Sequence, residues 1–434
     1  DVLVVENGGI VQLERRDVDP HPQYYDWRSA IANVDERAEI GPGGVLTGSG
    51  RIRFGGPGTP SGTQVLDNSG TIFGSSFGLR IEALGGGTLD LDGDNEQGVI
   101  TGPGATIVDG PLSDAFSGTI DFSDGGSIRF ENEWSIVNAD VLLGDGSLQG
   151  APLTAAGLNM QIAGGRCYNG MTVNSGLVDV DGVVNLLGEA TYTFAAAAEL
   201  NLDKASTIRI GDFWADSEST RVTINQSHID LDGTDGNVEL RIGRTDSLTL
   251  NVDTIDVSAS NDFDGNIMIY SGGNLEVNVA GRWRLDGDLT FRAHDGDEPV
   301  RLGGSPLTVV GSMVVENGAH GERIDGQIDS DIVFTPSSVF EIESHSHFDL
   351  TGQVTFDGGS LVGDGSITLR ESPVITTSTA FGYHTVTLDE LDILIPVDES
   401  LGFRRVEYEG IISIAGGTTL TQTDHAAIGE GARV

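Results

Sequence analysis

Cysteine, aromatic residues and long apolar segments are scarce in this chain of 434 residues. Cys167 is the only cysteine, which excludes an intramolecular disulfide, and we expect it to be a small buried residue. No run of about 18 apolar residues occurs, so the sequence predicts no transmembrane segment. Aromatic residues make up 6% of the chain and apolar residues 38%, which favours a narrow aliphatic core over a broad globular one.

Basic residues are also scarce: there are 23, of which Lys204 is the only lysine, against 66 acidic residues. The formal net charge of -43 makes nucleic acid an implausible partner, because so acidic a surface repels phosphate backbones and anionic lipids alike. Such a surface stays soluble where salt screens its self-repulsion. The charge therefore points to a saline setting or to bound divalent cations.

Glycine is abundant, with 63 residues, and it recurs in a short motif. The motif is an aliphatic-x-Gly-x-Gly-x-aliphatic corner between two strand-like segments, found at residues 46–52, 142–148 and 361–367. Its aliphatic residues and both glycines fall at every second position, which predicts that they share one face of an extended chain that bends at the glycines. Repeated corners of this kind are typical of a coiled strand solenoid.

The rest of the chain repeats the order strand, turn, strand, and no segment after residue 41 keeps a helical period for ten residues. We therefore predict an all-β, right-handed parallel β-solenoid (β-helix), with about 20 to 25 residues per coil, in which each coil stacks on the next. The composition does not change as it would at a linker, so residues 1–434 are interpreted as a single elongated solenoid. Residues 14–40 are the least repetitive, and we expect an insertion or cap there, with a short helix over 28–38. Tandem β-sandwich modules are the alternative architecture.

The three glycine corners resemble the strand repeats of bacterial autotransporter passengers and related secreted adhesins. The resemblance implies a right-handed β-solenoid displayed outside the cell or on its surface, as a rod that adheres or assembles.

Acid-rich turns are the most frequent polar feature of the sequence. Two of them are candidate Ca²⁺ loops, because clustered hard oxygen ligands on a tight turn suit this ion; their ligands would be Asp90, Asp92 and Asp94 in the first and Asp230 and Asp232 in the second. The competing interpretation is that Asp and Gly form good turns and keep sheet edges charged without any ion.

A second candidate metal site is the segment 343–349. If the segment is one strand, Glu343, His345, His347 and Asp349 project from one face, and two imidazoles two residues apart can share a metal ion. The alternative is a polar strip that faces solvent and holds no ligand.

No sequence motif identifies an enzyme. A nucleophile elbow, a phosphate loop and a zinc-protease motif are all missing, and with 66 acids a pair of carboxylates carries no information about glycoside hydrolysis. We predict an extracellular structural or adhesive protein that self-associates end to end into a filament or surface layer. The alternative is a β-helix that binds or cleaves carbohydrate, as a polysaccharide lyase or hydrolase does, and a polysaccharide or a cell surface is the second candidate partner.

Overall fold

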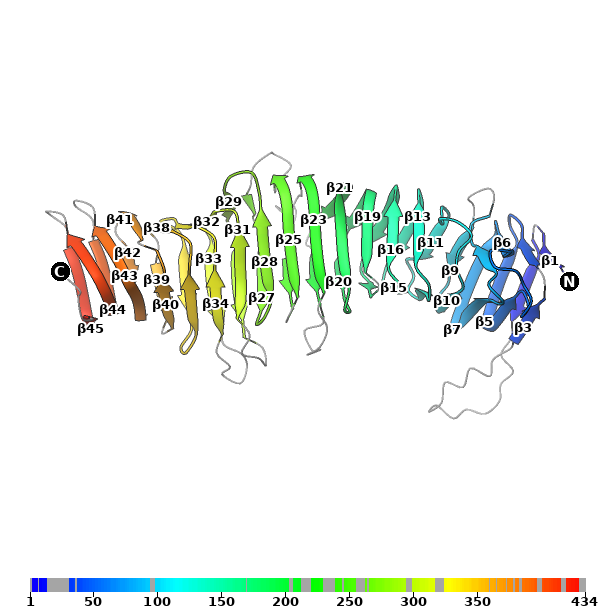
Figure 1. Ribbon diagram of the computed structural model, residues 1–434, viewed down its shortest axis with the longest axis horizontal. Coiled ribbons are helices and arrows are strands. Elements are labelled where there is room, and N and C mark those ends of the chain that lie inside the picture. The colour runs from blue at the N-terminus through cyan, green and yellow to red at the C-terminus, as the bar shows by residue number, and fades with distance from the viewer. Residues whose placement is uncertain are drawn as a thin grey trace. The chain divides into compact units, whose positions relative to one another are not determined.

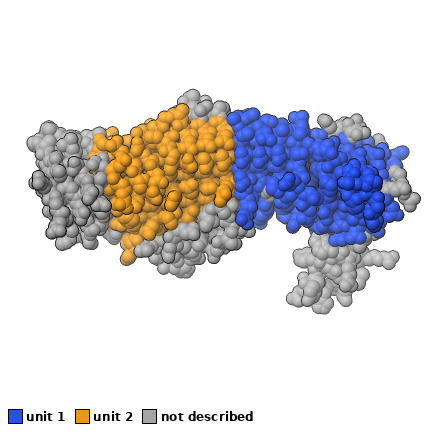
Figure 2. Space-filling view, in the orientation of Figure 1, with its two compact units in different colours: residues 1–201 blue, residues 202–434 orange. Residues whose placement is uncertain are grey.

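The structure, a computed structural model, is built from strands that wind into stacked coils (Figure 1). It describes residues 2–6, 8–13, 31–35, 37–93, 98–168, 170–202, 206–211, 220–228, 239–243, 246–254, 262–263, 265–293, 299–316, 324–358, 360–363, 365–371, 373–377, 379–381, 385–395, 400–414 and 419–428. These residues contain no helix, and hence none long and apolar enough to cross a membrane. The chain divides into two compact units, residues 1–201 and 202–434 (Figure 2).

The strands up to residue 202 are, in chain order, β1 (Val2–Val5), β2 (Ile10–Leu13), β3 (Ile31–Val34), β4 (Arg37–Ile40), β5 (Val45–Phe54), β6 (Gln64–Asn68), β7 (Thr71–Ala83), β8 (Thr88–Asp90), β9 (Val99–Thr101), β10 (Ala105–Asp109), β11 (Thr119–Phe122), β12 (Ser127–Phe130), β13 (Trp134–Val137), β14 (Asp140–Leu143), β15 (Ser147–Gly150), β16 (Leu153–Ala156), β17 (Leu158–Ile162), β18 (Arg166–Cys167), β19 (Met171–Val180), β20 (Val183–Leu186) and β21 (Thr191–Leu202).

The strands after it are β22 (Thr207–Ile210), β23 (Arg221–His228), β24 (Glu239–Ile242), β25 (Ser247–Thr254), β26 (Asp262–Phe263), β27 (Asn266–Tyr270), β28 (Asn274–Asn278), β29 (Trp283–Leu285), β30 (Asp288–Arg292), β31 (Val300–Gly304), β32 (Leu307–Val309), β33 (Ser312–Glu316), β34 (Asp325–Ile328), β35 (Ile332–Phe334), β36 (Val339–Ile342), β37 (His347–Leu350), β38 (Val354–Asp357), β39 (Ser360–Gly363), β40 (Ser366–Leu369), β41 (Val374–Thr377), β42 (Thr379–Phe381), β43 (Thr385–Ile395), β44 (Ser400–Ile414) and β45 (Thr419–Ile428).

Each coil repeats the strand directions of the coil before it. β11 pairs with β14 and β14 with β17 in the first unit, and β30 pairs with β33 and β33 with β36 in the second, all in parallel. The ladders that join β1 to β4 and β5 to β7 are parallel as well, which confirms the parallel β-solenoid, an architecture that antiparallel β-sandwich modules do not have. Coil length varies more than the sequence predicted: hydrogen-bonded partners one coil apart are 19 residues apart at Asp140 and Asn159 but 27 apart at Asn251 and Asn278.

The core of the first unit is a file of aliphatic side chains stacked from coil to coil. In one file the residues in register are Ile72, Ile100, Ile120, Val141, Met160 and Val178. All are 2% exposed or less. Burying each such side chain contributes roughly 1.5–3 kcal/mol. A shift of one residue in the pairing would expose all of these side chains to solvent, and this cost keeps the strands in register.

The glycine corners behave in two ways. At residues 46–52 Leu46, Gly48, Gly50 and Ile52 are all buried in β5, but so is Ser49 between the glycines, and the register of β5 against β7 shifts between Gly48 and Gly50. At residues 142–148 the prediction of one shared face is wrong for Leu142, which lies on the outward side of β14 beside the buried Leu143. Here the two glycines form a corner between strands, where a Cβ on Gly144 would lie 1.9 Å from the backbone oxygen of Ser123 in the preceding coil.

The short helix predicted over 28–38 is wrong. β3 pairs with β5, and β4 pairs with both β1 and β6, so the described part of this segment belongs to the coils. The charged residues Asp35, Arg37 and Glu39 made the segment resemble the polar face of a helix. The alternating apolar residues Ala38 and Ile40, both buried, are instead the pattern of a strand.

One aromatic ring in the second unit fills a space that a glycine leaves. Gly326 and Phe348 are in register on β34 and β37, and a Cβ on Gly326 would lie 2.2 Å from the Phe348 ring. We predict that Gly326→Ala destabilises this unit by about 1–3 kcal/mol through overpacking. Phe348→Leu in that background should recover part of the loss, measured as a double-mutant cycle in urea unfolding.

Gly303 on β31 provides the control for this substitution. A Cβ added to Gly303 would have no heavy atom within 4 Å, so Gly303→Ala should leave the unfolding midpoint nearly unchanged. Additive effects of Gly326→Ala and Phe348→Leu would contradict the ring-over-glycine packing.

Candidate functional site

Three carboxylates meet on the first unit, beside the strand pair β6 and β8. Asp90 ends β8, Asp92 follows it in a turn, and Asp114 comes from the next coil, where Leu112 bridges to Leu89. The carboxylate oxygens of the three residues lie within 4.8 Å of one another. Among the described residues this is the single group of three potential metal-ligating side chains of the Asp, Glu, His and Cys types.

Hydrogen bonds from neighbouring residues hold the two buried members in place. Asp90, 6% exposed, accepts a hydrogen bond from the backbone N–H of Gly93 at 2.6 Å and one from Gln64 Nε2 at 2.8 Å. Asp92, 4% exposed, accepts from both the backbone N–H and the hydroxyl of Ser117, at 2.5 and 2.6 Å. Fixed in this way, the carboxylates cannot rotate apart to relieve their repulsion.

The electrostatics of the cluster are unfavourable to full ionisation. Burial raises the pKa of Asp90 from its ordinary 3.8 to about 6; the hydrogen bond from Gly93 opposes the rise, and the charges of Asp114, Asp92 and Asp67 add to it. A positive ion among these groups would oppose the rise in the pKa of Asp90, because it stabilises the ionised carboxylates. The donor set consists of hard oxygen atoms, which suits Ca²⁺ and not Zn²⁺, since no imidazole or thiolate takes part.

Two of the predicted Ca²⁺ ligands belong to this cluster, and Ca²⁺ binding stays a prediction. Asp90 and Asp92 come together, whereas Asp94, Asp230 and Asp232 lie outside the described residues. Asp114 was missed because its place depends on the register of Leu112 on Leu89, one coil earlier. A repeat alignment that pairs the aliphatic residues of successive coils is the signal that would have found it.

The segment 343–349 is not the single strand that was predicted. β36 ends at Ile342 and β37 begins at His347, and Ser344 and His345 form a turn in which His345 has a φ of 72°. Because of this turn, Glu343 and His345 are not part of the row of outward-facing side chains on β37. The row consists of His347 and Asp349.

Those two residues belong to a hydrogen-bonded strip. His347 Nδ1 lies 2.8 Å from Ser366 Oγ, its Nε2 lies 3.3 Å from Thr368 Oγ1, and Arg370 donates to Asp349 at 2.9 Å. Both ring nitrogens of His347 are therefore engaged. This is the arrangement of a polar outer face, the alternative interpretation of the segment.

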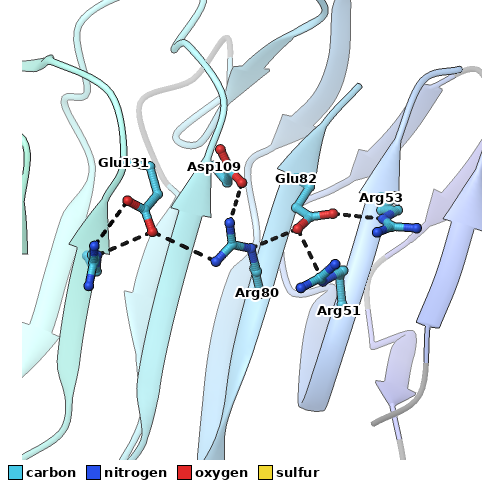
Figure 3. Close-up of polar contacts among 7 residues, drawn as sticks. Arg51, Arg53, Arg80, Glu82, Asp109 and Glu131 are labelled. Carbon is cyan, nitrogen blue, oxygen red and sulfur yellow. Dashed lines mark hydrogen bonds and ion pairs between the residues drawn. The ribbon is translucent and has the colours of Figure 1, made fainter. Parts of the chain in front are cut away.

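A charged ladder runs along the outward faces of β5, β7 and β10 and onto the residue after β12 (Figure 3). Glu82 is its centre: Arg53 and Arg80 both lie 2.7 Å from its carboxylate and Arg51 lies 3.1 Å away. Arg80 also pairs with Asp109, and lies 3.8 Å from Glu131, which in turn lies 3.3 Å from Arg129.

The ladder stabilises the ionised form of its central acid. Burial acts to raise the pKa of Glu82, but hydrogen bonds from Arg53 and Arg80 and the charges of Arg51 and Arg53 outweigh it, so its pKa is lowered. Every arginine of the ladder has a carboxylate partner. The ladder therefore acts as a brace between coils and offers no free site for an anion.

No protein-family model, no curated protein and no solved structure matches this chain. The parallel β-sheet architecture implied by the adhesin resemblance is present, and membership of an adhesin family stays a prediction.

Proposed function

We propose that the protein is an extracellular structural or adhesive β-solenoid whose copies associate end to end into a filament or surface layer. One observation carries the proposal: each coil offers the next a parallel strand edge, so an end coil can template a coil of another copy. Within the described residues, β1, β2 and β3 each pair with one neighbouring coil, through β4 and β5. Ile10 on this edge coil is 66% exposed and Val4 is 51% exposed.

We further propose that Ca²⁺ binds the carboxylates of Asp90, Asp92 and Asp114. The support is their separation, their burial and their all-oxygen chemistry. A net charge of -43 would keep copies apart at low ionic strength, and divalent cations would lower this repulsion. Assembly should therefore depend on salt and on Ca²⁺.

The edge of β2 gives the test. The carbonyl of Gly9 accepts a hydrogen bond from Val45, so the peptide groups of Ile10, the next residue, face the other way, toward the side of β2 on which no described strand pairs with it. Ile10→Pro removes one edge donor at the first position of the strand, where proline is tolerated. We expect filaments of the unmodified chain in electron microscopy at high salt with Ca²⁺, and dispersed particles of the variant.

The matched control is Phe77→Ser, which removes an exposed apolar side chain from β7, a strand that β5 separates from β2. Its filaments should be unchanged. Dispersed particles of the unmodified chain under every condition, or filaments of Ile10→Pro equal to those of the parent, would overturn the proposal.

A further inference from the structure

An open groove of about 600 Å³ lies on the outward side of β15, β18 and β20, three strands stacked in successive coils of the first unit. Its polar and aromatic lining comes from Asp145, Ser147, Gln149, Arg166, Tyr168 and Asn185. Ser147, Arg166 and Asn185 are in register across the three strands. A pocket that holds a small organic ligand is typically of this size.

The groove exists because the chain has little side-chain volume at the bends before two of these strands. Ala163, Gly164 and Gly165 precede β18, and Gly182 precedes β20, all of them lining the groove. Gly165 and Gly182 have φ values of 119° and 146°, which L side chains rarely adopt. The hollow is therefore built into the backbone and does not depend on the rotamer of a surface side chain.

Tyr168 places an aromatic ring at this hollow. Its side chain is 39% exposed, whereas the largest rings of the described core, such as Trp283, Tyr192 and Phe54, are less than 2% exposed. An accessible tyrosine offers a flat apolar face and a hydroxyl at low entropic cost, because only two side-chain torsions need to be fixed.

The two amides of the groove are held by the protein itself. Gln149 Nε2 donates to Ser147 Oγ at 2.8 Å and Asn185 Nδ2 donates to the carbonyl of Gly165 at 3.1 Å. These bonds fix the side chains with their amide oxygens available as acceptors for hydroxyl groups of a ligand. The carboxylate of Asp145 is a third acceptor on the same surface.

Arg166 supplies donors. Its side chain is exposed, and no carboxylate of the described residues forms an ion pair with it, although the chain contains 66 acids. The arginines of the charged ladder, by contrast, each bind a carboxylate. The planar guanidinium of Arg166 can therefore donate to ligand oxygens without first giving up a partner.

We propose that this groove binds a neutral saccharide, with a sugar ring packed on Tyr168 and its hydroxyls paired with Arg166, Asp145, Gln149 and Asn185. The fixed amide oxygens can accept hydrogen bonds, the Arg166 guanidinium can donate them, and the exposed Tyr168 ring offers an apolar surface. A sugar ring, which has an apolar face and hydroxyls around its edge, fits this combination. The ligand is neutral because a protein of net charge -43 repels a polyanion. This inference goes beyond the structural role proposed above, and it gives the assembled protein a means to attach to a glycan-bearing surface.

The test is titration calorimetry of the full chain with neutral gluco-, manno- and xylo-oligosaccharides and with an oligouronate series. We expect at least one neutral series to bind, Tyr168→Ala to weaken that binding roughly tenfold or more, and Tyr168→Phe to keep it within about threefold. Arg166→Ala should weaken the same binding independently. Circular dichroism verifies that each variant is folded, which is expected because both side chains are exposed.

Phe77→Ala is the matched control, since it removes an exposed ring from β7, outside the groove. Affinity for the neutral saccharide should not change in this variant. Three results would each overturn the proposal: no neutral series binds, only the uronates bind, or binding survives both Tyr168→Ala and Arg166→Ala. Filament formation is measured separately, so a failure of saccharide binding would not affect the test of the proposed assembly.

Discussion

Asp90→Asn is expected to stabilise the first unit at pH 7.5 without Ca²⁺ and to remove the stabilisation that Ca²⁺ gives to the unmodified chain. The pKa of Asp90 is raised to about 6, so the folded state holds its proton more tightly than the unfolded chain, in which the ordinary value of 3.8 applies. Stability from this group is complete below pH 3.8 and is lost as pH rises through 6. The loss amounts to about 3 kcal/mol, since one pKa unit is worth 1.36 kcal/mol.

Asparagine keeps the shape of the protonated acid and can still accept from Gly93, while Gln64 must turn its amide oxygen toward the new Nδ2 donor. The substitution should then recover about 1–3 kcal/mol at neutral pH. In the unmodified chain, urea unfolding should show stability falling between about pH 4 and 6.5, and saturating Ca²⁺ should restore it. Binding at 100 times the dissociation constant contributes about 2.7 kcal/mol. Hydrogen exchange at β8 and at residues 112–117 locates the effect.

Asp124, an exposed acid in the turn after β11, gives the control. Asp124→Asn should leave both the pH profile and the Ca²⁺ response as they are. A Ca²⁺ effect of equal size in Asp90→Asn and in the unmodified chain would rule out this cluster as the binding site.

The sequence sufficed for the fold because alternation and the glycine corners report on each strand separately. Ile120, Phe122, Ile128 and Phe130 alternate in the sequence and all four are buried in β11 and β12. The alternation of residues gave a wrong prediction at 343–349, because a polar segment of this kind is compatible both with a solvent-facing strand and with a turn. The structure has a turn there, in which His345 has a φ of 72°.

Contacts between coils could not be read from the sequence in the same way, because coil length varies. Two hydrogen-bonded pairs show this: Arg53 and Glu82 are 29 residues apart, and Gln64 and Asp90 are 26 apart. Each pair comes together only if the coil between its two members has the right length. A weak signal for the charged ladder does exist: β5, β7 and β12 each carry an arginine directly before a core residue, Ile52, Ile81 or Phe130. Aligning the strands on those core residues brings Arg51, Arg80 and Arg129 onto one outward row.

Glu82→Gln is expected to destabilise the first unit by about 2–4 kcal/mol. The substitution leaves Arg51, Arg53 and Arg80 close together without the carboxylate that they share, and breaking a buried pair costs about 3–5 kcal/mol, less where the partners are partly exposed. Because the pKa of Glu82 is lowered, its contribution is present above about pH 4.5 and is lost as pH falls through the lowered value. Urea unfolding at pH 7 and at pH 3.5, with and without 1 M NaCl, measures this contribution.

Glu316→Gln is the matched control. Among the described residues Glu316 forms an ion pair only with Arg292, at 3.3 Å, and both side chains are more than one third exposed, so its loss should cost less than about 0.5 kcal/mol. The difference between the two variants should shrink at pH 3.5, where Glu82 gains its proton in the unfolded chain, and in 1 M salt, which screens the exposed arginines. A difference that persists unchanged under both conditions would mean that Glu82 acts through packing and not through its charge. The charged ladder would then contribute nothing as an electrostatic brace between coils.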